Sequence, residues 1–172
     1  MVIMHRDGGA TVYDILITIW DLVFNVKAAS FKMPSWYIKH SPNTLTAPEK
    51  EQLAKSITRL YVAVGLPAFY VQVHFLEDVP GTSFVGGAPH PNFAALTIYH
   101  IARAFKSDEA KVQFLARVDE ILNPVFEAKG MEWEYFIAES SRDLWKINGL
   151  VPPQPGSEGE KKWAELNKAV KL

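Results

Sequence analysis

The chain has 172 residues, of which 48% are hydrophobic and 22% are charged, and this balance is typical of one soluble globular domain. Its 18 lysines and arginines nearly balance 19 aspartates and glutamates, without a block of like charge, which argues against nucleic-acid binding and a polybasic membrane anchor. Because it has no cysteine, disulfides, thiolate nucleophiles and cysteine zinc sites are excluded, and a reducing, cytoplasmic location is favoured.

Residues 1–32 are predicted to be an N-terminal extension of uncertain structure. The apolar run from Val12 to Phe24 contains Asp14 and Asp21 and is shorter than the roughly 20 residues that a membrane-spanning helix needs. The weakly basic start and the internal aspartate also fit a signal peptide poorly. We expect either an added peripheral element or a translation start placed upstream of the true one, with a membrane or targeting role as the alternative.

From Pro34 onward the sequence predicts a regular order of strands and helices. Residues 35–40 are short and aromatic-rich, which favours a strand, and turn residues follow at 41–44. Thr46 and Glu49 have the spacing of a helix capping box. Apolar residues at helical spacing follow, until Gly65 ends the helix; these are Leu53, Ile57, Leu60, Tyr61 and Val64.

The second part of the chain repeats this order. Residues 70–76 and 95–102 are predicted strands, and the glycine- and proline-rich segment 78–92 between them is predicted to be a loop in which Gly86 and Gly87 would bring backbone amides close to a ligand. Ser107 caps a second helix that ends near Pro124. Its buried face is predicted to hold Val112, Leu115, Val118, Leu122 and Val125. A strand at 131–138, at most a short helix at 143–147 and an amphipathic tail helix at 161–170 complete the chain.

This order of elements predicts an α+β fold over residues 33–172. Two β-α-β units side by side give a two-layer sandwich, with a four- to five-stranded sheet and both helices on one of its faces. The other face of the sheet stays uncovered, which predicts self-association.

The residues alone do not identify a chemistry. The five histidines have no metal-ligand spacing, so no metal site is predicted, and there is no phosphate-binding loop or nucleophile elbow. Trp133 and Phe136 are predicted to belong to the core.

Short motifs carry a more specific signal. Met33-Pro34 before a strand resembles the start of tautomerase superfamily proteins, in which the methionine is removed and proline becomes the N-terminus. Downstream motifs look like the cis-3-chloroacrylic acid dehalogenase-like group, in particular its fungal tautomerase-like branch, over about residues 34–160. In chain order they are Leu45-Thr46, Ala54-Lys55, Ile57-Thr58, Val71-Gln72-Val73, Phe84-x-Gly86-Gly87, Trp133-x-Tyr135-Phe136 and Pro153-Gln154-Pro155-Gly156-x-Glu158-Gly159.

The resemblance implies a cofactor-independent isomerase, a keto–enol tautomerase of a small 2-keto or 2-hydroxy unsaturated acid. Pro34 is implied as the general acid or base. A free α-amine titrates near about 7.7–8.0, and burial beside cations lowers that value. The resemblance also implies a homotrimer.

The same resemblance implies the other site residues. Arg103 is the expected carboxylate anchor, because arginine's planar fork matches a carboxylate, and Lys106 stands where a second arginine is expected. Tyr135 falls on the family's active-site tyrosine. Tyr61 replaces a substrate-binding histidine of the dehalogenase, although a core tyrosine is an equal reading. Asn148, beside Ile147, would orient a water. His100, on the strand that leads to Arg103, is a further candidate for substrate binding, and a satisfied core or surface histidine is the alternative reading.

Two departures from the family leave alternatives open. Ile147 stands where the dehalogenase has a water-activating glutamate, which disfavours efficient hydrolytic dehalogenation. Pro34 is internal in this chain, and an amide nitrogen cannot act as acid or base. The alternatives are therefore a catalytically inactive tautomerase-fold oligomer with a binding or structural role, or a hydratase or dehalogenase-like lyase.

Overall fold

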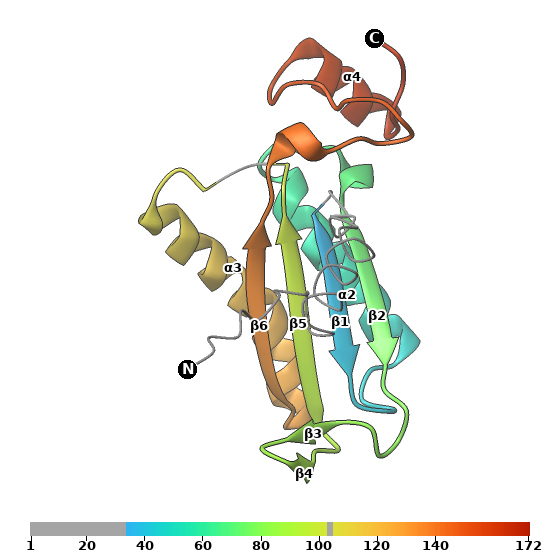
Figure 1. The fold of residues 1–172 in the computed structure, drawn as a ribbon, viewed down its shortest axis with the longest axis vertical. Coiled ribbons are helices and arrows are strands. Elements are labelled where there is room, and N and C mark those ends of the chain that lie inside the picture. The colour runs from blue at the N-terminus through green and yellow to red at the C-terminus, as the bar shows by residue number, and fades with distance from the viewer. Residues whose placement is uncertain (1–33, 103–104) are drawn as a thin grey trace, which may run out of the picture. The chain divides into compact units, whose positions relative to one another are not determined.

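The structure is a computed structural model that describes residues 34–102 and 105–172 (Figure 1). The predicted extension at 1–32 and the predicted anchor Arg103 therefore lie outside the described residues. Its centre is a four-stranded sheet of order β2-β1-β5-β6. The strands are β1 (Ser35–His40), β2 (Gln72–Glu77), β5 (Phe93–His100) and β6 (Glu132–Glu139).

The sheet consists of two β-α-β units, as the sequence predicts. Strands β1 and β2 are parallel and are joined through α2 (Ala47–Val62), while β5 and β6 are parallel and are joined through α3 (Asp108–Phe126) and the short 3₁₀ helix η2 (Glu127–Lys129). The two units meet where β1 runs antiparallel to β5. Both helices cover the same face of the sheet (Figure 1), so the predicted two-layer α+β sandwich is confirmed.

The core lies between the helices and the sheet. Every second residue of β1 and β5 faces the helices, which is the two-residue period of a strand, and α2 and α3 bury one stripe each. The buried positions of α2 are Leu53, Ile57 and Tyr61, and those of α3 are Val118, Leu122 and Phe126. The expected burial of Val64, Val112 and Leu115 is wrong, because these side chains are 64%, 64% and 38% exposed. Val64 follows the end of α2, and Val112 and Leu115 lie in the first half of α3, before its buried positions begin at Val118.

The segment 78–92, predicted to be a loop, contains a small hairpin. Strands β3 (Phe84–Val85) and β4 (Ala88–Pro89) pair through a two-residue turn. Gly86 and Gly87 have φ angles of 59° and 84°, and a tight hairpin turn needs such positive values at both central positions. The hairpin precedes β5 (Figure 1), and the cavity described below lies at the other end of that strand. The two glycines therefore form a turn and do not contact that cavity.

The C-terminal segment packs over the end of the sheet at which β5 and β6 finish (Figure 1). It contains the 3₁₀ helix η3 (Arg142–Leu144) and the helix α4 (Glu158–Leu166), which begins earlier than predicted because Ser157 caps it. Trp145 packs edge-on against Tyr70 of the 3₁₀ helix η1 (Ala68–Tyr70), with ring centroids 4.8 Å apart. Tyr70 thus links the C-terminal segment to the segment before β2.

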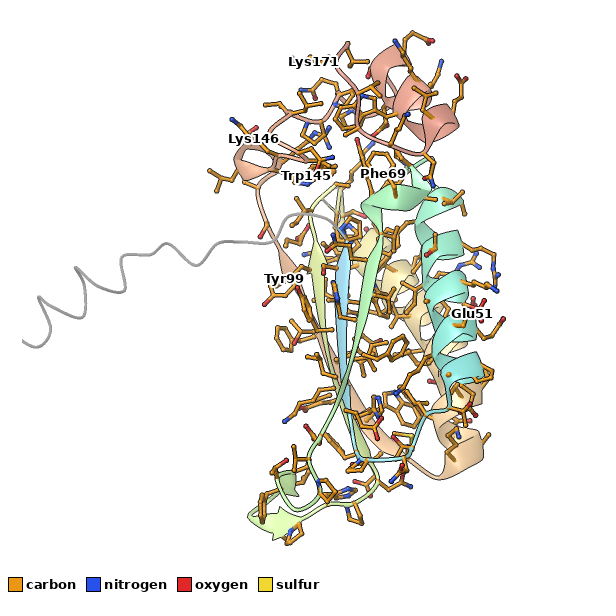
Figure 2. The ribbon with its side chains drawn as sticks, turned by 90° about the vertical axis from the view of Figure 1, so that its right-hand side faces the viewer. Glu51, Phe69, Tyr99, Trp145, Lys146 and Lys171 are labelled. Atoms are coloured by element: carbon orange, nitrogen blue, oxygen red, sulfur yellow. The ribbon has the colours of Figure 1, made fainter. Side chains whose placement is uncertain are left out.

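The second face of the sheet carries no helix. Figure 2 shows Tyr99 on the side of the sheet opposite to α2, the helix that carries Glu51. Tyr37 stacks on His74 at 4.8 Å on this face and meets Tyr99 edge-on at 6.0 Å. Phe136, predicted to be core, is 61% exposed there, because the alternation of β6 places its neighbours on the helix side.

Within residues 34–102 and 105–172, no helix is both long enough and apolar enough to cross a bilayer.

Candidate functional site

Strand order brings the predicted proline and histidine to one end of the sheet. Pro34 directly precedes β1, and His100 is the last residue of β5. Since Ser35 pairs with Tyr99 in the antiparallel register, Pro34 and His100 are adjacent across the two central strands. The carbonyl of Pro34 also accepts a hydrogen bond of 2.8 Å from the backbone N–H of Gln72, which holds this chain segment against the start of β2.

A cavity of about 760 Å³ opens at this end, between α2, α3 and the ends of the central strands. This volume is in the range of small-molecule sites, roughly 300–1,000 Å³. Four residues predicted from the sequence line it together: Pro34, Tyr61, His100 and Lys106. Pro34, Tyr61 and His100 are buried and form its floor, while Lys106 is exposed at its rim.

Tyr61 lies in the last turn of α2 and is 2% exposed. Its hydroxyl oxygen accepts a hydrogen bond of 3.0 Å from Nε1 of Trp36, a fully buried residue of β1. Burial raises the pKa of Tyr61 far above its ordinary value, which outweighs the opposite effect of the Trp36 hydrogen bond. Tyr61 is therefore both a core residue, as one reading of the sequence had it, and part of the cavity.

His100 is held by aromatic rings. It stacks on Phe105 with ring centroids 4.5 Å apart and meets Phe114 of α3 edge-on at 5.0 Å. Burial lowers the pKa of His100, and the nearby Glu139 carboxylate only partly opposes this, so the ring is uncharged at neutral pH. Its Nδ1 is buried and has no hydrogen-bond partner among the described residues. It is thus a neutral polar group at the cavity floor.

The rim of the cavity is positively charged. Arg59, Lys106 and Arg117 line it and are exposed, and Glu120 is the one acidic side chain among the described residues that line it. Arg59 donates to Ser56 at 2.8 Å, and Arg117 pairs with Glu120 at 3.4 Å. Among the described residues Lys106 has no ion pair, which leaves its ammonium available to a ligand. The net charge of the rim favours an anion.

Sequence reasoning missed Arg59 and Arg117, although the helices carried a usable signal. Residues three or four apart lie on one face of a helix. Ser56 and Arg59 of α2 form such a stripe with the C-cap residue Ala63. A stripe on α3 lines the same cavity: Ala110, Gln113, Phe114, Arg117, Glu120 and Ile121. Both stripes adjoin the buried faces of their helices, but the sequence does not show that they face each other.

The structure does not bring Tyr135 and Asn148 into this cavity. Tyr135 of β6 donates a hydrogen bond of 2.7 Å to Asp119 and lines a separate cavity of about 320 Å³. Asn148 is exposed in the tight turn between Ile147 and Leu150 and has a positive φ of 50°. The predicted roles of both residues stay predictions, as does that of Arg103.

No three metal-binding side chains lie together in the part of the chain that the structure describes.

Comparison with known proteins identifies the family. The family described as "Putative oxalocrotonate tautomerase enzyme" matches residues 33–168, starting at the methionine before Pro34. The chain belongs to this tautomerase family. The resemblance to the tautomerase superfamily that the motifs indicated is therefore confirmed.

Two solved structures are similar to this chain in sequence and in fold. A protein of the thermophilic fungus Aspergillus fumigatus, described as a probable enzyme, is 61% identical to this chain, with a TM-score of 0.79; the match covers 82% of this chain and 99% of the fungal one. Native RhCC from Rhodococcus jostii RHA1 is 39% identical over 81% of this chain and 100% of its own, with a TM-score of 0.78.

More distant comparisons show the fold alone. N1, a member of the cis-3-chloroacrylic acid dehalogenase family, is 20% identical over 78% of this tautomerase chain and 98% of its own, with a TM-score of 0.63. None of the curated proteins matches this chain.

Proposed function

We propose that the protein is a cofactor-independent tautomerase that interconverts the keto and enol forms of a small 2-keto or 2-hydroxy unsaturated acid. The observation that carries this proposal is the position of Pro34. The proline lies in the buried floor of a cavity that Tyr61 also lines and that has three cations at its rim. Membership of the tautomerase family supports the same activity.

The proposed chemistry moves one proton and consumes nothing. A free Pro34 nitrogen takes a proton from the enol oxygen or from carbon and returns a proton to the other atom, as a general acid and base. The hydroxyl of Tyr61 donates a hydrogen bond to the ligand oxygen on which negative charge develops. Arg59, Lys106 and Arg117 attract the carboxylate of the acid, and Arg103 stays the proposed anchor from the family resemblance.

This mechanism requires that Pro34 carries a free amine. An internal proline has an amide nitrogen without a basic lone pair. The family match begins at Met33, which supports a mature form that starts at Pro34 after the methionine is removed. In that form the nitrogen would lie at the floor of the cavity, where burial and the rim cations favour its neutral, basic state.

The alternatives receive less support. Ile147 stands where the dehalogenase has its water-activating glutamate. The isoleucine is almost fully buried and does not line the cavity, so a hydrolytic dehalogenase would lack a base at this position. An inactive oligomer of the same fold is favoured by the peptide bond that precedes Pro34 and by the absence of a glutamate at position 147.

We also propose that the protein assembles as a homotrimer in the cytoplasm. The family resemblance implies the trimer, and the uncovered sheet face supports it, since Leu76 is 49% exposed and Phe136 is 61% exposed there. Exposed apolar side chains on a sheet face that no helix covers fit an interface with a second copy of the chain.

The activity is tested with phenylpyruvate and 2-hydroxymuconate in an enol–keto assay. The form that starts at Pro34 is expected to be active, and Pro34→Ala in that form should lower kcat/KM by roughly 100-fold or more, as for other general acid–base groups. The chain that retains residues 1–33 should be inactive. Equal activity of the Pro34 form and the Pro34→Ala variant would refute the assigned role.

A further inference from the structure

The hydrogen bond between Trp36 and Tyr61 has a direction that follows from its chemistry. The indole Nε1 of Trp36 is a donor only, and it lies 3.0 Å from the hydroxyl oxygen of Tyr61. The hydroxyl oxygen must therefore be the acceptor. Both side chains are buried, at 0% and 2% exposure, so water does not compete for this contact.

The hydroxyl group of Tyr61 can also donate a hydrogen bond. No residue in the described part of the chain accepts it; the neighbouring rings of His100 and Phe114 lie with centroids 6.1 Å and 5.9 Å from that of Tyr61, and neither accepts a hydrogen bond from it. A buried donor without a partner is costly, and Tyr61 lines the floor of the cavity. The direction left for the proton is into the cavity.

We propose that Trp36 is a positioning residue that holds the Tyr61 hydroxyl as a hydrogen-bond donor to an acceptor oxygen of the bound acid. The acceptor is an unprotonated oxygen, such as the carbonyl of a keto acid or the enolate formed from it. The inference rests on the proposed function for the identity of the ligand, but it concerns a residue that does not contact the ligand.

Burial strengthens this arrangement. The raised pKa of Tyr61 keeps its hydroxyl protonated at any pH at which the protein is used, so it donates and does not act as a base. Among the described residues, only the N–H of Trp36 donates a hydrogen bond to the hydroxyl oxygen of Tyr61. This hydrogen bond restricts the rotation of the O–H. In the proposed tautomerase, such a preorganised donor stabilises the negative charge that develops on the substrate oxygen.

A double-mutant cycle on the full chain tests the pair through ligand binding. Phenylpyruvate is titrated by calorimetry into the unmodified protein, Trp36→Phe, Tyr61→Phe and the double variant. Each single substitution is expected to raise Kd about fivefold to tenfold, the range for one hydrogen bond. The double variant should bind no more weakly than Tyr61→Phe, because Trp36 acts through Tyr61.

Two further variants separate positioning from packing. Trp145→Phe removes another fully buried indole, one that does not line the cavity, and should leave Kd unchanged. If Trp36→Phe does not fold, benzothienylalanine at position 36 keeps the shape of the ring and replaces the N–H by sulfur. This variant should raise Kd to the same extent, about fivefold to tenfold.

Three results would overturn the inference. They are an unchanged Kd in the position-36 variants, an equal loss from Trp36→Phe when Tyr61 is already Phe, and no measurable phenylpyruvate binding to the unmodified chain. The binding measurement does not need a free Pro34 amine. If the full chain binds as expected but the form that starts at Pro34 does not turn over the acid, the tautomerase proposal is refuted and the positioning role stays intact.

Discussion

The ammonium of Lys129 lies 2.9 Å from a carboxylate oxygen of Glu49, and this ion pair joins the two β-α-β units. Glu49 lies in the first turn of α2, and Lys129 lies in η2 after α3. The same carboxylate accepts hydrogen bonds from the backbone N–H and the hydroxyl of Thr46, at 2.7 and 2.8 Å. The predicted capping box is therefore also a link between the two halves of the fold.

Glu49→Gln is expected to lower the free energy of unfolding by about 1 kcal/mol at pH 7, because glutamine can keep the capping hydrogen bonds but cannot form the ion pair with Lys129. The hydrogen bond from Lys129, followed by those from Thr46, lowers the pKa of Glu49 to about 2. Because the folded pKa lies below the unfolded one, the stabilisation is complete above about pH 4.5 and is lost as the pH falls toward 2. Urea unfolding at pH 7 and near pH 2 measures this difference.

Glu51→Gln is the matched control. Glu51 lies on the same helix and pairs with Lys55, but both side chains are largely exposed, and such pairs contribute little. A Glu49→Gln variant that is no less stable than Glu51→Gln at pH 7, or whose deficit is undiminished near pH 2, would contradict the proposed link.

Arg59→Gln is expected to raise KM for a carboxylate substrate about fivefold, with a smaller change in kcat, because the rim cation attracts the acid without contacting the reacting atoms. The effect should shrink as salt is added, since Arg59 is exposed. Steady-state kinetics at two salt concentrations check this. Lys55→Gln, on the same helix but away from the cavity, should leave KM unchanged; an equal effect of both variants would contradict a rim-specific role.

The fold and half of the candidate site could be predicted from the sequence. Alternating and helical periods identify the strands and helices, and the family motif identifies Pro34, because these are local features. The sequence does not predict that Arg59 and Arg117 line the same cavity, since this depends on how α2 and α3 lie on the sheet. Family position also suggested Tyr135, whose hydroxyl instead donates to Asp119 on the helix side of β6.

Phe136 illustrates the same limit. The alternation of β6 shows that Tyr135 and Phe136 point to opposite faces, but not which face the helices cover. That choice follows from the pairing of β6 with β5, where Thr97 opposite Phe136 also faces the uncovered side. The prediction of a loop at 78–92 missed the small hairpin for a different reason. Strands of two residues are too short to show an alternating pattern in the sequence.

Tyr61→Phe and Tyr135→Phe should differ in their effect on catalysis. In the proposed arrangement the hydroxyl of Tyr61 donates to the ligand, so its loss is expected to lower kcat/KM by about tenfold or more. Tyr135→Phe removes a hydrogen bond to Asp119 and should mainly lower stability, by about 1 kcal/mol. Steady-state kinetics and urea unfolding of both variants measure these two effects. A larger loss of kcat/KM in Tyr135→Phe than in Tyr61→Phe would support the active-site role that the family position suggests for Tyr135.

Phe136→Glu is expected to break up the proposed trimer. A charge on the exposed apolar face would be buried without a partner in an assembled sheet surface. Light scattering coupled to size exclusion should show a trimer for the unmodified protein and smaller species for the variant. Val112→Glu, an equally exposed position on α3, is the control and should stay trimeric; dissociation of both, or of neither, would argue against the sheet face as the interface.

The proposed mechanism requires that the active protein carries a free Pro34 amine in the cavity. The most direct test is the intact mass of the protein isolated from its native source, measured on the fraction that has enol–keto activity. The expected mass is that of a chain starting at Pro34. Activity in a fraction whose mass retains Met33 or any earlier residue would contradict the proline mechanism.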